Sequence, residues 1–253
     1  MKAILISVLT LLTTLSFGQN SVKFEPFKRS DYPEEKYQIT SESIVFRNLL
    51  IEIQQVRNKS GYEPFSCRAW LTINNNGKSI YQRFFKSIDA VGSCYGIFIP
   101  LSQPRNDYFI LSKLGDYDGR IFIIDTKGNV TEKLGGQFYV SKDKRYLFSD
   151  YYSDESGLTV FDFTTGQTIF SETITPRLFE WYYKDNKYIS RVDLSNGQIS
   201  STDYYYFDLA TKKMILFKQN KDYLKPEDRL TPYNDKNTRR FCNCGLELQP
   251  GQK

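Results

Sequence analysis

Apolar residues in this chain form short runs between polar turns, and one arrangement of them recurs three times between Phe98 and Lys218. Each copy begins with an aromatic residue on a short apolar run, turns, restarts at a Tyr and loops. It then gives a strand, an Asp, a turn and a last strand. The equivalent positions, 37 to 46 residues apart, are Phe98, Phe138 and Phe179; Tyr108, Tyr146 and Tyr188; and Asp125, Asp162 and Asp208.

This repeat predicts a strand at each apolar run. Predicted first strands cover 98–102, 138–141 and 179–182; second strands start at 107, 145 and 187; third strands cover 120–125, 158–162 and 204–208; fourth strands cover 130–133, 168–172 and 213–218. A more divergent unit precedes them, with strands predicted at 44–47, 49–56, 65–73 and 78–85. Turn signals at this regular spacing leave no room for a long helix.

A period near 40 residues with four short strands per unit is typical of a propeller blade rather than of a helical repeat. The sequence therefore predicts an all-β fold, a small β-propeller-like array of about four to five four-stranded blades. We expect a recurring role for Asp125, Asp162 and Asp208, whose carboxylates can accept backbone N–H groups of the turn that follows each third strand.

Two stretches of the second copy resemble a known class of repeat. The segment 141–147, Ser-Lys-Asp-Lys-Arg-Tyr-Leu, and the segment 160–166, Val-Phe-Asp-Phe-Thr-Thr-Gly, are similar to the blade signatures of WD40-like and TolB-like β-propellers. The resemblance covers about half of the chain. It departs from the signature after Asp143, where Lys144 replaces the usual Gly, and there is no Trp-Asp pair. The resemblance implies blades but no activity, because propellers bind, scaffold and catalyse alike.

The ends of the chain differ from the repeat. Lys2, an apolar run over 3–15 and small residues before Gln19 predict a signal peptide over 1–18, and hence an exported, periplasmic or extracellular protein. A lead-in is expected over 19–42, the propeller-like domain over 43–218, and a tail over 219–253 that could close the last blade. No stretch after the signal peptide is apolar enough to span a membrane.

Charge and composition exclude several classes of function. The formal charge of +5 falls to +4 without residues 1–18, and the basic residues are dispersed, which argues against a nucleic-acid partner. The chain has no His, so Ser-His-Asp and Cys-His catalysis and His-ligated metals are excluded. No cofactor is therefore expected, apart from a weak indication of Ca²⁺ at 116–119, Asp-Tyr-Asp-Gly, which lacks the third acid and closing Glu of a calcium loop.

Four Cys remain in the mature chain: Cys67, Cys94, Cys242 and Cys244. An even count in an exported protein indicates disulfides, with three pairings that the sequence does not separate. The simplest pairing joins Cys67 to Cys94. Cys242 and Cys244 then either form a small strained ring or pair with the upstream Cys residues.

Candidate ligand-binding residues come from the loops between second and third strands, which in propellers that resemble this one share a rim. These loops carry carboxylates and Tyr side chains. The predicted ligand-binding residues are Asp116, Tyr117, Asp118, Tyr151, Tyr152, Asp154, Glu155, Asp193 and Asp203. Asp, Asn and Gly are also what exposed turns consist of, and the aromatic runs at 181–183 and 204–206 are equally explained as part core and part surface.

We therefore predict an exported, non-catalytic protein that uses one rim of the array to bind a protein or a glycan. One alternative is a carbohydrate-active envelope enzyme whose acid and base are rim carboxylates. Another is an inhibitor or structural module that covers a partner protein.

Overall fold

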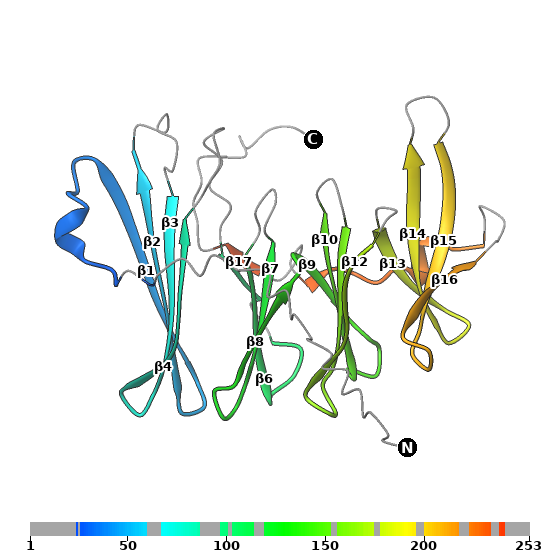
Figure 1. Cartoon of the computed structure of the whole chain (residues 1–253), viewed down its shortest axis with the longest axis horizontal. Helices are drawn as coiled ribbons and strands as arrows, with labels where there is room; N and C mark the ends of the chain where they lie inside the picture. Colours follow the sequence, from blue (N-terminus) through cyan, green and yellow to red (C-terminus); the bar gives the residue numbers. More distant parts are fainter. Residues whose placement is uncertain are drawn as a thin grey trace, which may run out of the picture.

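Four antiparallel sheets stand side by side in an open row in the computed structural model of the chain (Figure 1). The structure describes residues 24, 26–59, 67–86, 97–100, 103–113, 119–152, 156–174, 178–195, 200–217, 223–233 and 238–240. Strands that are consecutive in the chain are neighbours in each sheet. The fold is all-β and propeller-like, as the repeat predicts, and the row of sheets does not close into a ring.

Each sheet contains four consecutive strands, and the second sheet has a fifth strand from the C-terminal part of the chain. The first contains β1 (Tyr37–Phe46), β2 (Leu49–Asn58), β3 (Cys67–Asn75) and β4 (Lys78–Lys86); the second contains β5 (Ile97–Pro100), β6 (Tyr108–Lys113), β7 (Arg120–Asp125) and β8 (Val130–Leu134). The third contains β9 (Gln137–Val140), β10 (Tyr146–Tyr152), β11 (Ser156–Asp162) and β12 (Gln167–Ile174); the fourth contains β13 (Leu178–Lys184), β14 (Lys187–Ser195), β15 (Ser200–Asp208) and β16 (Lys213–Phe217).

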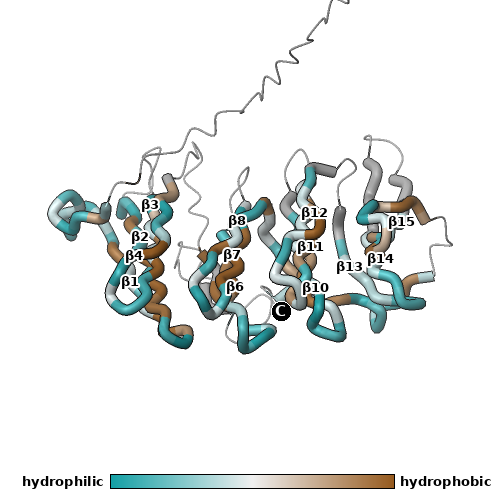
Figure 2. Tube along the Cα trace, turned by 60° about the horizontal axis from the view of Figure 1, so that its bottom comes forward, coloured by the Kyte–Doolittle hydropathy of each residue, from teal (hydrophilic) through white to brown (hydrophobic). Residues whose placement is uncertain are grey.

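The sheets are held together by side chains that alternate between two cores. In β7, Phe122 and Ile124 pack against the first sheet, while Ile121 and Ile123 pack against the third. Successive strand residues point to opposite faces, so a strand between two sheets must be apolar at every position. This explains why Ile-Phe-Ile-Ile is a continuous buried run rather than an alternating one. Figure 2 shows the hydrophobic strands and hydrophilic turns that result.

The two ends of the row are covered by the chain itself. On the first sheet, Phe24, Phe27 and Tyr32 pack over Trp70 and its neighbours. On the fourth, Tyr223 and Leu224 pack over Tyr182, Ile189 and Tyr204. Terminal units of an open repeat array need such caps, since each repeat buries its faces only against neighbours.

The segment after β16 returns along the row. It contains a short 3-10 turn, η2 (Pro226–Asp228), and then Leu230, whose N–H donates to the Trp181 carbonyl oxygen of the fourth sheet at 2.8 Å. Tyr233 stacks on Phe138 of the third sheet, with ring centroids 5.6 Å apart. The final strand, β17 (Thr238–Arg240), pairs antiparallel with β5 of the second sheet. We call residues 223–240 the return segment.

Two features of the sheets differ from the sequence-based expectation. The first sheet begins at Tyr37, inside the predicted lead-in, because β1 continues pairing with β2 as far as Asn58. The last described strand, from the predicted tail, adds to the second sheet rather than to the last blade. In the part of the chain described here, no helix is long and apolar enough to cross a membrane.

Candidate functional site

The strand ends that flank the predicted ligand-binding loops all lie at one side of the row, the upper side in Figure 1. Tyr151 and Tyr152 end β10, Asp193 is in β14, and Asp203 is in β15 opposite Val192. The structure gives no side-chain environment for these four. Asp116, Tyr117, Asp118, Asp154 and Glu155 lie outside the described residues, so this set remains a prediction.

Two other features near that side are structural. Asp150, in β10, is buried and accepts a hydrogen bond from Trp181 Nε1 at 3.2 Å. Trp181, Tyr182 and Tyr204 are buried, as expected for aromatic runs that belong partly to the core.

The predicted disulfide and calcium site are not decided by the described residues. Cys67 begins β3, whereas Cys94, Cys242 and Cys244 lie outside them. No group of three or more Cys, Asp or Glu placed to hold a metal occurs among the residues with described positions. The 116–118 part of the calcium indication falls outside that set.

A cleft of about 700 Å³ opens on the opposite side of the row, where the tight turns lie. We call this side the turn rim. The cleft is formed by the β1–β2 turn, the β5–β6 connection, the β7–β8 turn and the β9–β10 turn, so it spans the first three sheets. Its described lining residues are Arg47, Asn48, Gln103, Pro104, Arg105, Asn106, Asp107, Thr126 and Lys144.

Arg105 organises the floor of this cleft. Its Nε and Nη2 donate to the two Asp107 carboxylate oxygens, each at 2.7 Å. Its Nη1 donates to the Lys144 carbonyl oxygen at 3.1 Å, and the guanidinium lies 5.4 Å from the Phe163 ring centroid. A planar guanidinium can make all of these contacts at once, whereas a Lys cannot. Arg105 therefore joins the second and third sheets and is itself neutralised by Asp107.

Gln103 and Arg47 also line the cleft. The Gln103 side chain accepts from the Ile110 N–H at 2.7 Å and donates to the Ile110 carbonyl oxygen at 3.2 Å, which imitates strand pairing after β5 has ended. Arg47 Nη2 makes one long contact, 3.4 Å, to the Asn106 carbonyl oxygen. These contacts hold the β5–β6 connection against its neighbours.

Arg47 and Lys144 present their side chains from left-handed backbone. Their φ angles are 58° and 57°, in a region that costs an L-residue about 1–2 kcal/mol and that Gly adopts freely. Both are exposed, and in the part of the chain described here neither makes an ion pair. Backbone strain of this kind gathers at functional sites.

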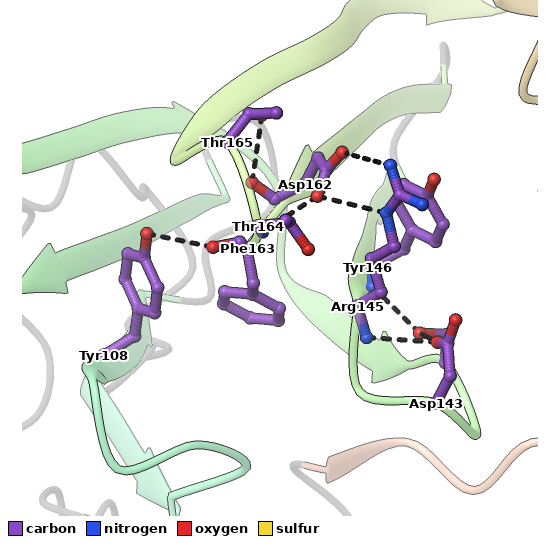
Figure 3. A network of polar contacts seen from close by, with 9 residues as sticks. Tyr108, Asp143, Arg145, Tyr146, Asp162, Phe163, Thr164 and Thr165 are labelled. Atoms are coloured by element: carbon purple, nitrogen blue, oxygen red, sulfur yellow. Dashed lines mark hydrogen bonds and ion pairs between the residues drawn. The ribbon is translucent and has the colours of Figure 1, made fainter.

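A local network fixes the turn that carries Lys144 (Figure 3). Ser141 Oγ donates to Asp143 Oδ1 at 2.5 Å and accepts from the Tyr146 N–H at 2.8 Å. Asp143 Oδ1 also accepts from the Arg145 N–H at 3.0 Å, and the Lys144 N–H donates to the Ser141 carbonyl oxygen at 2.8 Å. The Asp143 carboxylate is thus directed into the turn, while the Lys144 ammonium is left at the cleft.

The same figure shows how this turn is joined to its neighbours. Arg145 Nη2 donates to Asp162 Oδ2 at 3.1 Å, which ties the β9–β10 turn to the β11–β12 turn. Tyr108 Oη donates to the Phe163 carbonyl oxygen at 3.3 Å, from the second sheet to the third.

The recurring Asp carboxylates on this rim accept hydrogen bonds from the backbone of the turns that follow them. Asp125 accepts from the Lys127 and Asn129 N–H groups, Asp162 from the Thr164 N–H and Asp208 from the Ala210 N–H, each at 2.8 to 3.0 Å. This confirms the structural role predicted for the recurring Asp. Lys127, two residues after Asp125, is exposed.

The electrostatics of the cleft follow from these contacts. The hydrogen bond from Arg105 holds the pKa of Asp107 below its usual value, although partial burial opposes the shift, and Asp107 in turn raises the pKa of Arg105. The pair therefore stays ionised at neutral pH. Arg47 and Lys144 then add two positive charges that make no ion pair among the described residues.

Sequence reasoning missed this cleft because it lies on the turn rim, not among the longer loops. One signal was available: Lys144 occupies the position where the blade signature has Gly. Lys144 thus places a long cationic side chain at a turn position that favours Gly.

No protein-family model matches the sequence, and comparison with curated proteins gave no match. Solved structures do show similar arrangements. The β-propeller domain of the Trilobed protease from Pyrococcus furiosus, described as having an open velcro topology, is 12% identical with a TM-score of 0.38 over 79% of this chain and 71% of that one.

Two others are similar at the same level. Pyrococcus horikoshii acylaminoacyl peptidase is 11% identical with a TM-score of 0.34, over 72% of this chain and 32% of that one. Kuenenia stuttgartiensis hydrazine synthase is 11% identical with a TM-score of 0.35, over 70% and 62%. The fold assignment rests on the strand pairing of this chain itself.

Proposed function

We propose that this protein is an exported, non-catalytic binding module, and that the turn-rim cleft holds an anionic group of its partner. The observation that carries the proposal is the placement of Arg47 and Lys144. Two sheets each present a cation to the same cleft from a strained backbone position. Lys212 shares this conformation outside the cleft, so the convergence of two cations on one cleft supports the proposal, rather than the strain alone.

The cleft chemistry supports binding rather than catalysis. Its one described carboxylate, Asp107, is held by two hydrogen bonds from Arg105 and has a lowered pKa. A general acid needs a raised pKa, and a glycosidase needs a second carboxylate opposite the first. The cleft is instead a preformed, polar, positively charged surface, which is suited to capture of an anion.

A binding measurement on matched variants tests the proposal. The mature chain is immobilised and exposed to sulfated, carboxylated and neutral oligosaccharides and to an acidic peptide, with biolayer interferometry as the readout. Arg47→Gly/Lys144→Gly should weaken anion binding at least tenfold, since two half-screened charges contribute about 1.4 kcal/mol or more together. Raising NaCl should weaken wild-type binding as well.

Lys212→Gly is the matched control. Lys212 has the same left-handed conformation, φ 55°, in the β15–β16 turn of the fourth sheet, and it does not line the cleft. The control should bind anions like the wild type. Equal binding by the double variant, or no binding of any anionic probe by the wild type, would refute the proposal.

A further inference from the structure

The cleft differs from a purely electrostatic patch in its uncharged groups. Asn106 and Thr126 line it from the two connections of the second sheet, β5–β6 and β7–β8. Within the described chain, neither the Asn106 amide nor the Thr126 hydroxyl has a hydrogen-bond partner, unlike Asn48, whose Nδ2 donates to Asn75 Oδ1 at 3.0 Å. An amide and a hydroxyl can each donate and accept, as is needed to bind the hydroxyl groups of a sugar.

Apolar anchors are scarce in the same place. Among the described residues that line the cleft, Pro104 is the only apolar one, and it is buried. Protein partners are usually held by aromatic or aliphatic side chains that fill apolar pockets at the centre of an interface. A short acidic peptide would find cations here but no place for an apolar side chain.

Two of the three exposed large apolar side chains described in the first sheet face away from the cleft, and the third, Ile80, packs against Gly128 and does not line the cleft. Val45 and Leu50 are 76% and 36% exposed and lie opposite each other in the β1–β2 pair. Their neighbours Ile44 and Ile51 pack toward the second sheet, so Val45 and Leu50 face away from it. The cleft lies on the second-sheet side.

Further Lys side chains lie along the turn rim on both sides of Asn106 and Thr126. Lys127 follows Thr126 in the β7–β8 turn and is exposed. Lys142 lies two residues before Lys144, and its Nζ is 4.9 Å from the Tyr183 ring centroid of the fourth sheet. Packed sheets are about 10 Å apart, so these cations are spread along the row. A ligand with negative charges distributed along an extended chain would contact several of them.

From this combination we propose that the ligand of the cleft is an oligosaccharide whose sugars carry carboxylate or sulfate groups. This inference rests on the proposed function and names its partner class. In this arrangement Arg47 and Lys144 bind the oxyanions, and Asn106 and Thr126 bind the sugar hydroxyls. Arg105 and Asp107 keep the floor in place.

Calorimetric titration with four probes tests the inference: a mannuronate tetrasaccharide, a sulfated galactan tetrasaccharide, maltotetraose and tetraglutamate. Binding of either acidic tetrasaccharide, at least tenfold tighter than tetraglutamate and maltotetraose, is the expected result. The two acidic sugars show whether carboxylate or sulfate is preferred. Asn106→Ala/Thr126→Val should weaken the preferred sugar at least fivefold and leave tetraglutamate unchanged, because it alters no charge.

The outcomes separate this inference from the proposed function. Tetraglutamate binding as tightly as the sugars, with both lost in Arg47→Gly/Lys144→Gly, would overturn the sugar assignment and leave an anion site that takes acidic peptides. Equal binding of maltotetraose, or no binding by any probe, would overturn both. If Asn106→Ala/Thr126→Val has the same thermal unfolding midpoint as the wild type, the loss of sugar binding is local to the cleft.

Discussion

Arg47 and Lys144, from turns of the first and third sheets, line one cleft with nearly the same left-handed φ angle, 58° and 57°. A residue with a Cβ is costly there, and Gly would be tolerated at both positions. The fold and the candidate site thus make opposite demands on these two residues, which allows stability and binding to be separated by mutation.

Lys144→Gly should leave the free energy of unfolding unchanged or raise it by up to about 1 kcal/mol. Relief of the left-handed strain outweighs or offsets the greater entropy that Gly gives to the unfolded chain. Lys144→Ala keeps the Cβ and should give no gain, although both variants lose the charge. Urea unfolding measures this, and a loss of more than 1 kcal/mol in Lys144→Gly would contradict it.

Arg105→Lys should lower the free energy of unfolding by about 1–2 kcal/mol and weaken anion binding. A Lys cannot donate to both Asp107 oxygens and to the Lys144 carbonyl oxygen while stacking on Phe163. Thermal unfolding and the tetrasaccharide titration report the two effects. Arg29→Lys, at an exposed pair with Glu34, is a control expected to change neither.

Acid should destabilise the protein partly through Asp162. Burial opposes ionisation of this carboxyl, but hydrogen bonds from Arg145 and the Thr164 N–H outweigh it and lower its pKa. The stability gained this way is present above the unfolded-state pKa near 4 and is lost as the pH falls through the lower folded pKa. Asp162→Asn should therefore be less stable at pH 7, with a shallower loss from pH 5 to 2. A parallel pH profile would exclude the linkage.

Gly128→Ala and Gly77→Ala form a matched pair. Both Gly residues have positive φ, 90° and 79°, but an added Cβ would overlap Ile80 Cδ1 at Gly128 and would meet nothing within 4 Å at Gly77. Gly77→Ala should cost about 1 kcal/mol, and Gly128→Ala about 2 kcal/mol because the Ile80 and Leu49 side chains must also shift. Equal losses in urea unfolding would show that the contact with Ile80 adjusts without cost.

Leu230→Ala tests the return segment. Leu230 is buried in the core between the third and fourth sheets, so its truncation should cost about 2–4 kcal/mol. Glu227→Ala, exposed in the same segment, should stay within about 0.5 kcal/mol of the wild type. If the two variants unfolded alike, the segment would not contribute to the stability of the row.

Much of the fold was predictable because the repeat consists of apolar runs, turn residues and a recurring Asp, each of which requires a particular structural environment. The third strand Arg120–Asp125 and the turn that follows it match the prediction, since an apolar run before Asp must be a strand buried on both faces. The start of β1 was not predictable in the same way. Residues 37–42 alternate partly buried and exposed positions at an edge strand, and their polar sequence carries little signal.

The site was less predictable than the fold. A pattern locates turns along the chain but does not say which turns meet in space, and the cleft needs turns from three sheets. Gln103 imitates a strand partner for Ile110 only because β5 ends early, which is a tertiary relationship. The residue that did carry a signal was Lys144, at the expected Gly position.

The pairing of β17 with β5 also fixes the order in which the molecule can be completed. During synthesis from the N-terminus, β5 emerges from the ribosome long before Thr238–Arg240, so its outer edge stays open while both later sheets are made. The second sheet reaches its five-stranded form only after residues 238–240 have been made. A ribosome stalled before residue 238 would therefore hold a nascent chain in which the edge of β5 that pairs with β17 is still unpaired.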